Sequence, residues 1–325
     1  MLGTMSLPHR NRLLGAISIT LVLASVLGAR EAQAAAGRIK EFIVPTSSSH
    51  PGGIVLGPEG AVWFTEIATN AIDRFANRTF TRFPLPQGGE PLAITNGSDG
   101  ALWFVEYAGE RVGRITTDGQ ITEYSVPGAG PWDIAAGPDG ALWFTELDAD
   151  RIGRITTAGS ITHFSLPAQD ADPLGIANGP DGALWFTDGG GVARITTDGT
   201  VTHEWSGTSG NGITTGPDGN VWFMESSSDL AARLNPANGQ VSTFRIDIGC
   251  FPQEIASGSG SLWFTCYFLD EVGRVTVDGQ VTAFPVPNHF HGNYPDTLEG
   301  IVAGAGNDMW FTEEAANRIG RISTS

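Results

Sequence analysis

Lysine, cysteine and long apolar runs are all scarce in this chain of 325 residues. Lys40 is its single lysine, and 18 basic side chains stand against 35 acidic ones, for a formal net charge of −17. A surface this acidic repels nucleic acid and anionic lipid and favours cationic or neutral ligands, although solubility alone would also account for it. We therefore expect a small-molecule or peptide ligand and no nucleic acid.

The longest apolar run lies near the N-terminus. Residues 1–34 have the plan of a secretory signal peptide: two arginines, an apolar stretch over 13–29, and Ala-Gln-Ala at 32–34 as a cleavage site. An uncleaved membrane anchor is the alternative, but the run is short for a span and ends in a cleavage motif. We expect residues 35–325 to be secreted, periplasmic or extracellular, monomeric, and without membrane contact after cleavage.

Seven copies of one short unit occupy most of the remaining chain. One copy, residues 137–146, reads Gly-Pro-Asp-Gly-Ala-Leu-Trp-Phe-Thr-Glu. The copies lie about 40 residues apart, a period typical of β-propellers. Their tryptophans are Trp63, Trp103, Trp143, Trp185, Trp222, Trp263 and Trp310. We predict an all-β, seven-bladed β-propeller domain over residues 35–325.

One repeat, residues 132–167, shows how a blade is built. A Gly-Pro-Asp-Gly turn follows its first apolar segment, with proline and glycine at the positions that a tight turn favours. The predicted strands are 134–136, 141–145, 151–156 and 161–166. The pattern predicts four antiparallel strands per blade, with the aromatic pair packed between neighbouring blades.

The two ends of the propeller complement each other. The last repeat stops after its third strand, residues 317–322, whereas residues 38–45 resemble the fourth strand at 121–127. We therefore predict that the N-terminal strand completes the last blade, which removes two exposed strand edges.

The start of each first strand and the end of each second strand must share one face, near the channel. Six of the seven residues that end the second strands are carboxylates, which could form a cation site or could pair with backbone and arginine in the scaffold. They are Glu66, Glu106, Glu146, Asp188, Glu225 and Glu313, with Cys266 in the seventh place. The third strands also carry a repeated arginine. Because both features recur in every blade, we favour the structural interpretation.

Ligand recognition is expected where the repeats differ. The residue two places before the isoleucine that recurs in each first strand varies between blades: Gly52, Leu92, Trp132, Leu174, Asn211, Gln253 and Glu299. Variable side chains held by a rigid frame suit ligand binding. Our candidate ligand contacts on this face are Trp132, Asp133, Asp188, Phe251 and Tyr267.

An insertion before the last blade carries His289 and His291. Two nearby imidazoles can bind one metal, with Glu313 and Glu314 as further ligands, although histidines in a polar loop are often only solvated. We therefore list Mg²⁺ or another divalent cation as a candidate cofactor, and His289, His291 and Glu299 as candidate catalytic residues. His50 is a minor candidate on the same face. His163 and His203, on outer strands, are expected at the surface.

The two cysteines, Cys250 and Cys266, belong to the same blade and map to the same face. In an exported protein a disulfide is the expected state, with free thiols as the alternative. A catalytic cysteine is disfavoured because its blade supplies no partner histidine.

The units at 137–146, 151–157 and 161–167 resemble those of the virginiamycin B lyase (streptogramin lyase) family, and the resemblance extends over nearly all of residues 35–325. It implies a propeller fold. It also implies an enzyme that linearises a cyclic depsipeptide antibiotic by elimination at an ester, without water, using a histidine base and Mg²⁺ held near carboxylates.

The chain departs from the family pattern at the positions implied to be functional. The family places histidines in Pro-His-Gly/Ala-Ile units of the last two blades, whereas the matching units here are Pro252-Gln253-Glu254-Ile255 and Leu298-Glu299-Gly300-Ile301. Thr297 replaces a carboxylate, and the remaining family glutamate matches Glu314 or, with a shift, Glu313. Elimination requires a base beside the Cα proton, so we expect weak or no streptogramin lyase activity.

Three functions remain open at this point. The first is a lyase-like propeller that binds a small molecule or peptide at the channel face, with its lyase centre altered. The second is an active metal-dependent C–O lyase or lactone-opening enzyme for cyclic depsipeptides or lactones. The third is a protein- or glycan-binding scaffold in the envelope.

Overall fold

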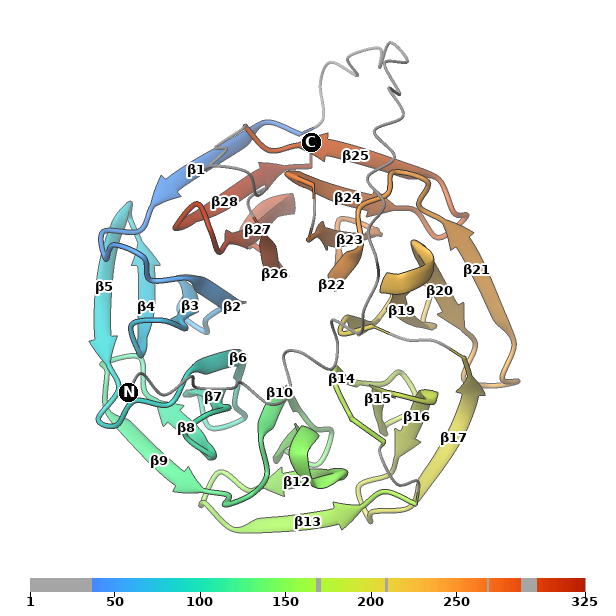
Figure 1. Cartoon of the computed structure of the whole chain (residues 1–325), viewed down its shortest axis with the longest axis horizontal. Coiled ribbons are helices and arrows are strands. Elements are labelled where there is room, and N and C mark those ends of the chain that lie inside the picture. Colours follow the sequence, from blue (N-terminus) through green and yellow to red (C-terminus); the bar gives the residue numbers. More distant parts are fainter. Residues whose placement is uncertain (1–36, 168–170, 208–209, 268, 288–296, 325) are drawn as a thin grey trace, which may run out of the picture. The chain divides into compact units, whose positions relative to one another are not determined.

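The computed structural model describes residues 37–167, 171–207, 210–267, 269–287 and 297–324, except for the side chains of His203 and Glu204. Over these residues, seven sheets of four antiparallel strands surround a central channel (Figure 1). This confirms the predicted seven-bladed propeller.

The blades are numbered in chain order, and their strands run from the channel outward. Blade one contains β2 (Pro51–Leu56), β3 (Val62–Glu66), β4 (Ala71–Ala76) and β5 (Thr79–Pro84), and blade two contains β6 (Pro91–Asn96), β7 (Leu102–Glu106), β8 (Arg111–Ile115) and β9 (Ile121–Ser125). Blade three contains β10 (Pro131–Ala136), β11 (Leu142–Glu146), β12 (Arg151–Ile155) and β13 (Ile161–Ser165), and blade four contains β14 (Ile176–Asn178), β15 (Leu184–Asp188), β16 (Gly191–Ile195) and β17 (Val201–Ser206). Blade five contains β18 (Ile213–Thr215), β19 (Val221–Glu225), β20 (Leu230–Leu234) and β21 (Val241–Arg245), and blade six contains β22 (Pro252–Gly258), β23 (Ser261–Cys266), β24 (Glu271–Val275) and β25 (Val281–Pro285). Blade seven contains β26 (Leu298–Ala303), β27 (Asp308–Glu313), β28 (Arg318–Ser323) and the N-terminal strand β1 (Ile39–Ile43). Short 3₁₀ turns occur at η1 (Leu147–Ala149), η2 (Ser226–Ser228) and η3 (Ala305–Asn307).

The Trp-Phe pair fills the interior of the blades. In blade three, Trp143 and Phe144 are fully buried, and Phe144 stands opposite Gly153 of the third strand. A Cβ on Gly153 would lie 2.2 Å from the Phe144 ring. The third strand therefore carries glycine here because the aromatic ring occupies the space of a side chain.

The Gly-Pro-Asp-Gly turn anchors both the tryptophan and the repeated arginine. Asp139 accepts hydrogen bonds from Trp143 Nε1 at 3.1 Å and from Arg154 Nε at 2.7 Å. Although burial opposes the shift, these bonds hold the pKa of Asp139 below its usual value. Four other members of the arginine set pair with the matching carboxylate of their own turn: Arg74, Arg114, Arg194 and Arg233. Arg321 pairs instead with Asp308, the first residue of β27. The arginines therefore stabilise the turn face, away from the face with the candidate ligand contacts.

The N-terminal strand closes the ring as predicted. β1 pairs with β28 in antiparallel register, with Phe42 opposite Ile319 and Ile39 opposite Ile322. Phe42 also packs against Trp310 of the last blade, with ring centroids 5.7 Å apart. Blade seven is thus built from both ends of the propeller chain.

Threonines near the ends of the second strands join each blade to the next one at the channel. The hydroxyl groups of Thr65, Thr145 and Thr265 each donate to a carbonyl of the following blade at 2.8 Å. Thr312 does the same across the seam, donating to the Gly52 carbonyl at 2.7 Å. These bonds fix the variable residues before the first strands, which form the channel wall.

Within the part of the chain that the structure describes, no helix has the length and apolar character needed to cross a membrane.

Candidate functional site on the channel face

A left-handed residue precedes the first strand in five blades. These residues have φ between 43° and 54°, and they are His50, Glu90, Gly130, Asp172 and Phe251. The His50 carbonyl accepts the amide of Ile67 at 3.1 Å, and the Phe251 carbonyl accepts that of Tyr267 at 3.2 Å. The conformation is thus part of the scaffold, and it sets the side chains at these positions around the channel mouth.

His50, Glu314 and Thr297 form a hydrogen-bonded group at the seam of blades one and seven. His50 Nδ1 lies 3.1 Å from Glu314 Oε1, and Thr297 Oγ1 donates to Glu314 Oε2 at 3.0 Å. The Glu314 amide also donates to the Thr297 carbonyl at 2.8 Å. Side-chain exposure is 46% for His50 and 13% for Glu314, so the carboxylate is sheltered while the imidazole reaches solvent.

A second acidic group lines the channel in blades three, six and seven. Asp133 accepts the amides of Ile134 at 2.7 Å and of Ile176, in the next blade, at 2.8 Å. Burial raises the pKa of Asp133 to about 6 despite these bonds. Glu254 keeps some contact with solvent but is enclosed by the channel wall, so desolvation, followed by the charges of Asp133 and Glu299, raises its pKa well above the usual value.

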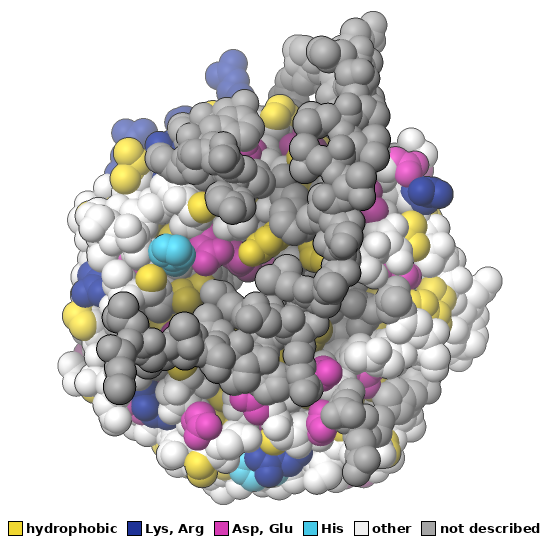
Figure 2. Space-filling view, viewed as in Figure 1, with side chains coloured by type: hydrophobic (Ala, Val, Ile, Leu, Met, Phe, Trp, Pro, Cys, Tyr) yellow, Lys and Arg dark blue, Asp and Glu magenta, His cyan; other side chains and the backbone are white. Residues whose placement is uncertain are grey.

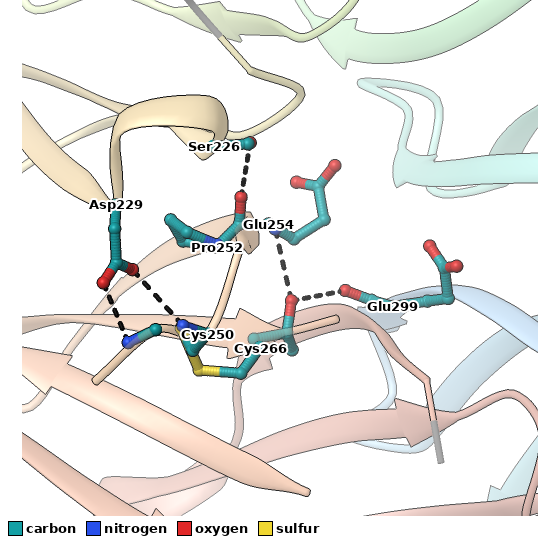
Figure 3. Close-up of a disulfide and its surroundings, with 9 residues drawn as sticks. Ser226, Asp229, Cys250, Pro252, Glu254, Cys266 and Glu299 are labelled. Carbon is teal, nitrogen blue, oxygen red and sulfur yellow. Dashed lines mark hydrogen bonds between the residues drawn. A yellow bond between two sulfur atoms is a disulfide. The ribbon is translucent and has the colours of Figure 1, made fainter. Parts of the chain in front are cut away.

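Glu254 and Glu299 project from the starts of neighbouring first strands, β22 and β26, and both point away from the disulfide (Figure 3). Thr265 Oγ1 accepts the Glu254 amide at 3.2 Å and donates to the Glu299 carbonyl at 2.8 Å. Figure 2 shows acidic side chains at the edge of the central opening, with a histidine beside them. Among the described residues, this face therefore combines negative charge with the exposed imidazole of His50.

Asp133 and Glu254 occupy a position that is small in the other blades. The equivalent residues are Gly53, Ala93, Gly175, Gly212 and Gly300. At Gly53 and Gly175, a Cβ would lie within 2.4 Å and 1.8 Å of a carbonyl oxygen of the following blade. Sequence reasoning found Asp133 but missed Glu254, although its acidic side chain at an otherwise small position was a usable signal.

The aromatic candidates lie at two places on the face. The Trp132 ring stands edge-on to Tyr107, with centroids 5.7 Å apart, and is partly exposed. Phe251 and Tyr267 are adjacent through their backbone bond and are both half-buried. Asp188 differs, because it is buried and accepts the Gly190 amide at 2.9 Å, as a turn-holding residue does.

The carboxylates that end the second strands are buried in the scaffold. Glu66 pairs with Arg82 at 2.8 Å and Glu106 with Arg111 at 2.7 Å. Glu146 pairs with Arg151 and with His163, both at 2.6 Å. Their geometry agrees with the structural interpretation. His163 is exposed, as expected, and its Nδ1 also contacts the buried Glu146 carboxylate.

A divalent cation finds no ready donor set in the described ranges. No group of three or more His, Cys, Asp or Glu side chains there is placed to hold a metal ion. Both Glu314 oxygens are engaged by Thr297 and His50, and Glu313 is fully buried. His289 and His291 lie outside the described residues, so the candidate site that includes them stays a prediction. We therefore derive no chemical step through a metal.

The predicted disulfide between Cys250 and Cys266 is present, with the two Cα atoms 4.9 Å apart. Asp229 accepts the Gly249 amide at 2.9 Å, and Ser226 Oγ donates to the Pro252 carbonyl at 2.5 Å (Figure 3). These contacts and the disulfide hold the segment that carries Phe251 at the start of β22.

Comparison with known proteins identifies a family and solved structures that this chain resembles. Residues 15–206 and 205–325 match the model of the Virginiamycin B lyase family. Virginiamycin B lyase from Staphylococcus aureus superposes with a TM-score of 0.83 at 32% identity, over 88% of this chain and 99% of that one. A catalytically inactive His-to-Ala variant of that enzyme with quinupristin gives 0.82 at 32% identity, over 88% and 99% of the two chains.

A streptogramin B lyase structure gives a TM-score of 0.82 at 29% identity, over 89% of this chain and 98% of that one. No curated protein matches the sequence. Because the family match covers most of the chain, the chain belongs to the virginiamycin B lyase family.

Proposed function

We propose that this propeller is exported, binds a small molecule or peptide at the channel face, and has an altered lyase centre. One observation carries the proposal: Gln253 and Glu299 stand where the family resemblance implies histidines. Gln253 is also held in the wall, because its Oε1 accepts Asn211 Nδ2 from the neighbouring blade at 2.7 Å. A neutral amide in this place cannot take a proton from a substrate.

Glu299 is a poor substitute for the second histidine. A carboxylate that accepts a proton from carbon is a weak base unless its own pKa is lifted toward the working pH. Thr297, in place of a carboxylate, adds a hydroxyl group that is already bonded to Glu314. The implied histidines and one of the implied carboxylates are thus replaced, whereas the remaining family glutamate is matched by Glu314 or, with a shift, by Glu313.

The remaining surface suits a ligand with cationic or hydrogen-donating groups. Asp133, Glu254 and Glu299 line the channel, and Trp132 offers a partly exposed ring near Asp133. Enclosed carboxylates attract ammonium or amide groups, while an indole ring packs against apolar or aromatic portions of a ligand. A depsipeptide or other compact peptide presents both kinds of group.

The test uses the purified exported protein with virginiamycin B and quinupristin as probes. Binding is measured by titration calorimetry, and ring opening by mass spectrometry, each with Mg²⁺ and with EDTA. We expect binding that weakens about tenfold or more in Trp132→Ala and in Glu254→Gln. Arg245→Ala, at an exposed position on an outer strand, is the control and should leave affinity unchanged.

Two outcomes would contradict the proposal. Rapid ring opening that EDTA abolishes would show an intact metal-dependent lyase. Absence of binding to either probe, together with folded protein, would favour a scaffold that recognises a larger partner in the envelope.

A further inference from the structure

We propose that a pocket on the turn face, at the seam between blades seven and one, binds a small monocarboxylate whose apolar part is about the size of one ring. This seam pocket lies away from the channel-face candidates, so the inference does not depend on the proposed function. It is carried by a break in the repeat that leaves two hydrogen-bond donors without their usual acceptor.

The seam pocket has a volume of about 170 Å³ and is lined by residues of both blades, which are neighbours in the ring (Figure 1). The side from blade one is largely apolar and includes Val62 and Phe75, whereas Asp308, Trp310 and Arg321 lie on the side from blade seven. An enclosed apolar cavity of about 150 Å³ can hold benzene. The seam pocket therefore has room for one ring with a short polar substituent.

Blade three shows how the repeat normally satisfies the two donors. Asp139 of its turn accepts Trp143 Nε1 through one carboxylate oxygen and Arg154 Nε through the other, at 3.1 Å and 2.7 Å. A turn carboxylate receives the same two donors in blades one, two and four. The indole and the guanidinium of a blade thus form a site that a single carboxylate fills.

Blade seven keeps the two donors but lacks this carboxylate. Gly306 lies four residues before Trp310, in the place that an acidic residue has in blades one to five. The Arg321 guanidinium lies 5.9 Å from the centre of the Trp310 ring, close to the 5.8 Å between Arg154 and Trp143. No described residue accepts a hydrogen bond from Trp310 Nε1 or from Arg321 Nε. The arrangement of the donors is therefore retained while the acceptor is missing.

The same place is open to solvent. Six of the seven repeat tryptophans are buried, whereas Trp310 is half-buried. The neighbouring hairpin of blade one is short, with four residues between the paired Phe75 and Phe80, compared with five between Ile115 and Ile121 in blade two. Two departures from the repeat, in adjacent blades, thus meet at the seam pocket.

The chemistry of the pocket favours a ligand with one negative charge. A ligand carboxylate can accept from Trp310 Nε1 and from Arg321, as Asp139 accepts from its own pair, and hydrogen bonds between charged groups are stronger than neutral ones. Asp308 already lies 3.3 Å from Arg321 Nη1 and repels a second negative charge on the ligand. Val62 and Phe75 offer the apolar part of the ligand a surface removed from water.

The test titrates benzoate into the purified protein at pH 7, where carboxylates are ionised, and follows binding by saturation-transfer NMR. We expect saturable binding with a dissociation constant on the order of a millimolar. Benzamide, which has the same shape without the charge, should bind about tenfold more weakly or not at all. Trp310→Phe removes the indole N–H and should weaken benzoate binding about tenfold, and Arg321→Gln should weaken it by at least as much.

Arg154→Gln is the matched control, because it removes the equivalent arginine from a blade whose turn carboxylate is present. Its affinity for benzoate should equal that of the wild type, and thermal melting shows whether each variant is folded at the assay temperature. Absence of saturable binding, equal affinity for benzamide, or an equal loss in Arg154→Gln would overturn the inference. Binding that Trp132→Ala abolishes and Trp310→Phe retains would overturn it too, but it would support a ligand site on the channel face.

Discussion

His163 and Glu146 meet through the middle of blade three, with Nδ1 of the histidine 2.6 Å from Oε1 of the carboxylate. His163 lies on the outermost strand and Glu146 ends the second strand, so the third strand separates them. The contact exists because Gly153, opposite His163 in register, has no side chain. The absence of a side chain at Gly153 therefore leaves room both for the Phe144 ring and for the contact between His163 and Glu146 across the third strand.

Replacing Gly153 by alanine should destabilise the protein. The new Cβ would lie 2.2 Å from the Phe144 ring and 2.7 Å from Glu146 Oε1, so both would have to move. We expect a loss of about 1–3 kcal/mol in the free energy of unfolding, the usual cost of overpacking. Urea unfolding measures it. Gly88→Ala, where the nearest atom would be 3.4 Å away, is the control and should change stability little. Equal stability of the two variants would refute the packing argument.

The buried Asp73 in blade one should make the free energy of unfolding decrease as pH rises. Asp73 occupies a position that is glycine or alanine in the other blades. Burial, then the charge of Glu66, raises the pKa of Asp73 to about 8, with Arg82 opposing the shift. Asp73 Oδ1 and Glu66 Oε1 accept no hydrogen bond from any described donor, which suits a proton shared between the two carboxyl groups. Since the folded pKa lies above the unfolded value near 4, this stabilising protonation is lost as pH passes through about 8.

Asp73→Asn keeps the shape and removes the titration. We expect the variant to melt above the wild type at pH 9, by the equivalent of about 1–3 kcal/mol, and to show a flatter dependence of melting temperature on pH. Calorimetric scans between pH 5 and pH 9 measure both effects. The same slope in both proteins would exclude the shared proton.

Glu254→Gln should stabilise the protein at alkaline pH. Desolvation, Asp133 and Glu299 raise the pKa of Glu254, so ionising it in the folded channel costs free energy that the unfolded chain does not pay. The gain should be about 1 kcal/mol or more at pH 9 and should shrink as pH is lowered through the folded pKa. Glu90→Gln, an exposed carboxyl group on the same face, is the control for urea unfolding at both pH values. An equal gain in the control would show a general charge effect.

Reduction of the Cys250–Cys266 disulfide should loosen blade six. The bridge closes a loop with a sequence separation of 16 residues, for which loss of the cross-link typically costs about 3 kcal/mol. We expect dithiothreitol to lower the melting temperature of the wild type. The Cys250→Ala/Cys266→Ala variant should have a lower melting temperature than the oxidised wild type, and dithiothreitol should not change it. A wild type indifferent to reduction would show that neighbouring contacts alone, such as those of Asp229, hold the segment.

The repeat made most of the fold predictable. Turn residues, alternating strands and the missing fourth strand are local signals, and the pairing of Phe42 with Ile319 follows from matching two sequence patterns. The disulfide was also predictable, because both cysteines map to one face of one blade. Such inferences need only the register of each repeat and no knowledge of side-chain direction.

The candidate site was harder to predict because its contacts join distant parts of the chain. His50 and Glu314 are 264 residues apart and meet only through ring closure. Glu254 stood one position beyond the variable ring on which sequence reasoning concentrated. His163 is at the surface as expected, but its contact with Glu146 was not predicted, because an alternating outer strand gives no sign that a glycine on the next strand leaves room for that contact. The spacing of the repeats predicts which residues share a strand or a face, but it does not predict which side chains make contact across a neighbouring strand.

The pairing of Ile39–Ile43 with Arg318–Ser323 also sets an order of assembly. A chain made from its N-terminus presents β1 first, yet the partner of that strand is the last to emerge. Six blades can form while synthesis continues, but the seventh waits for the final residues. A product that ends before β28 would leave β1 without the strand it pairs with. Closure of the ring therefore requires that the chain be synthesised through β28.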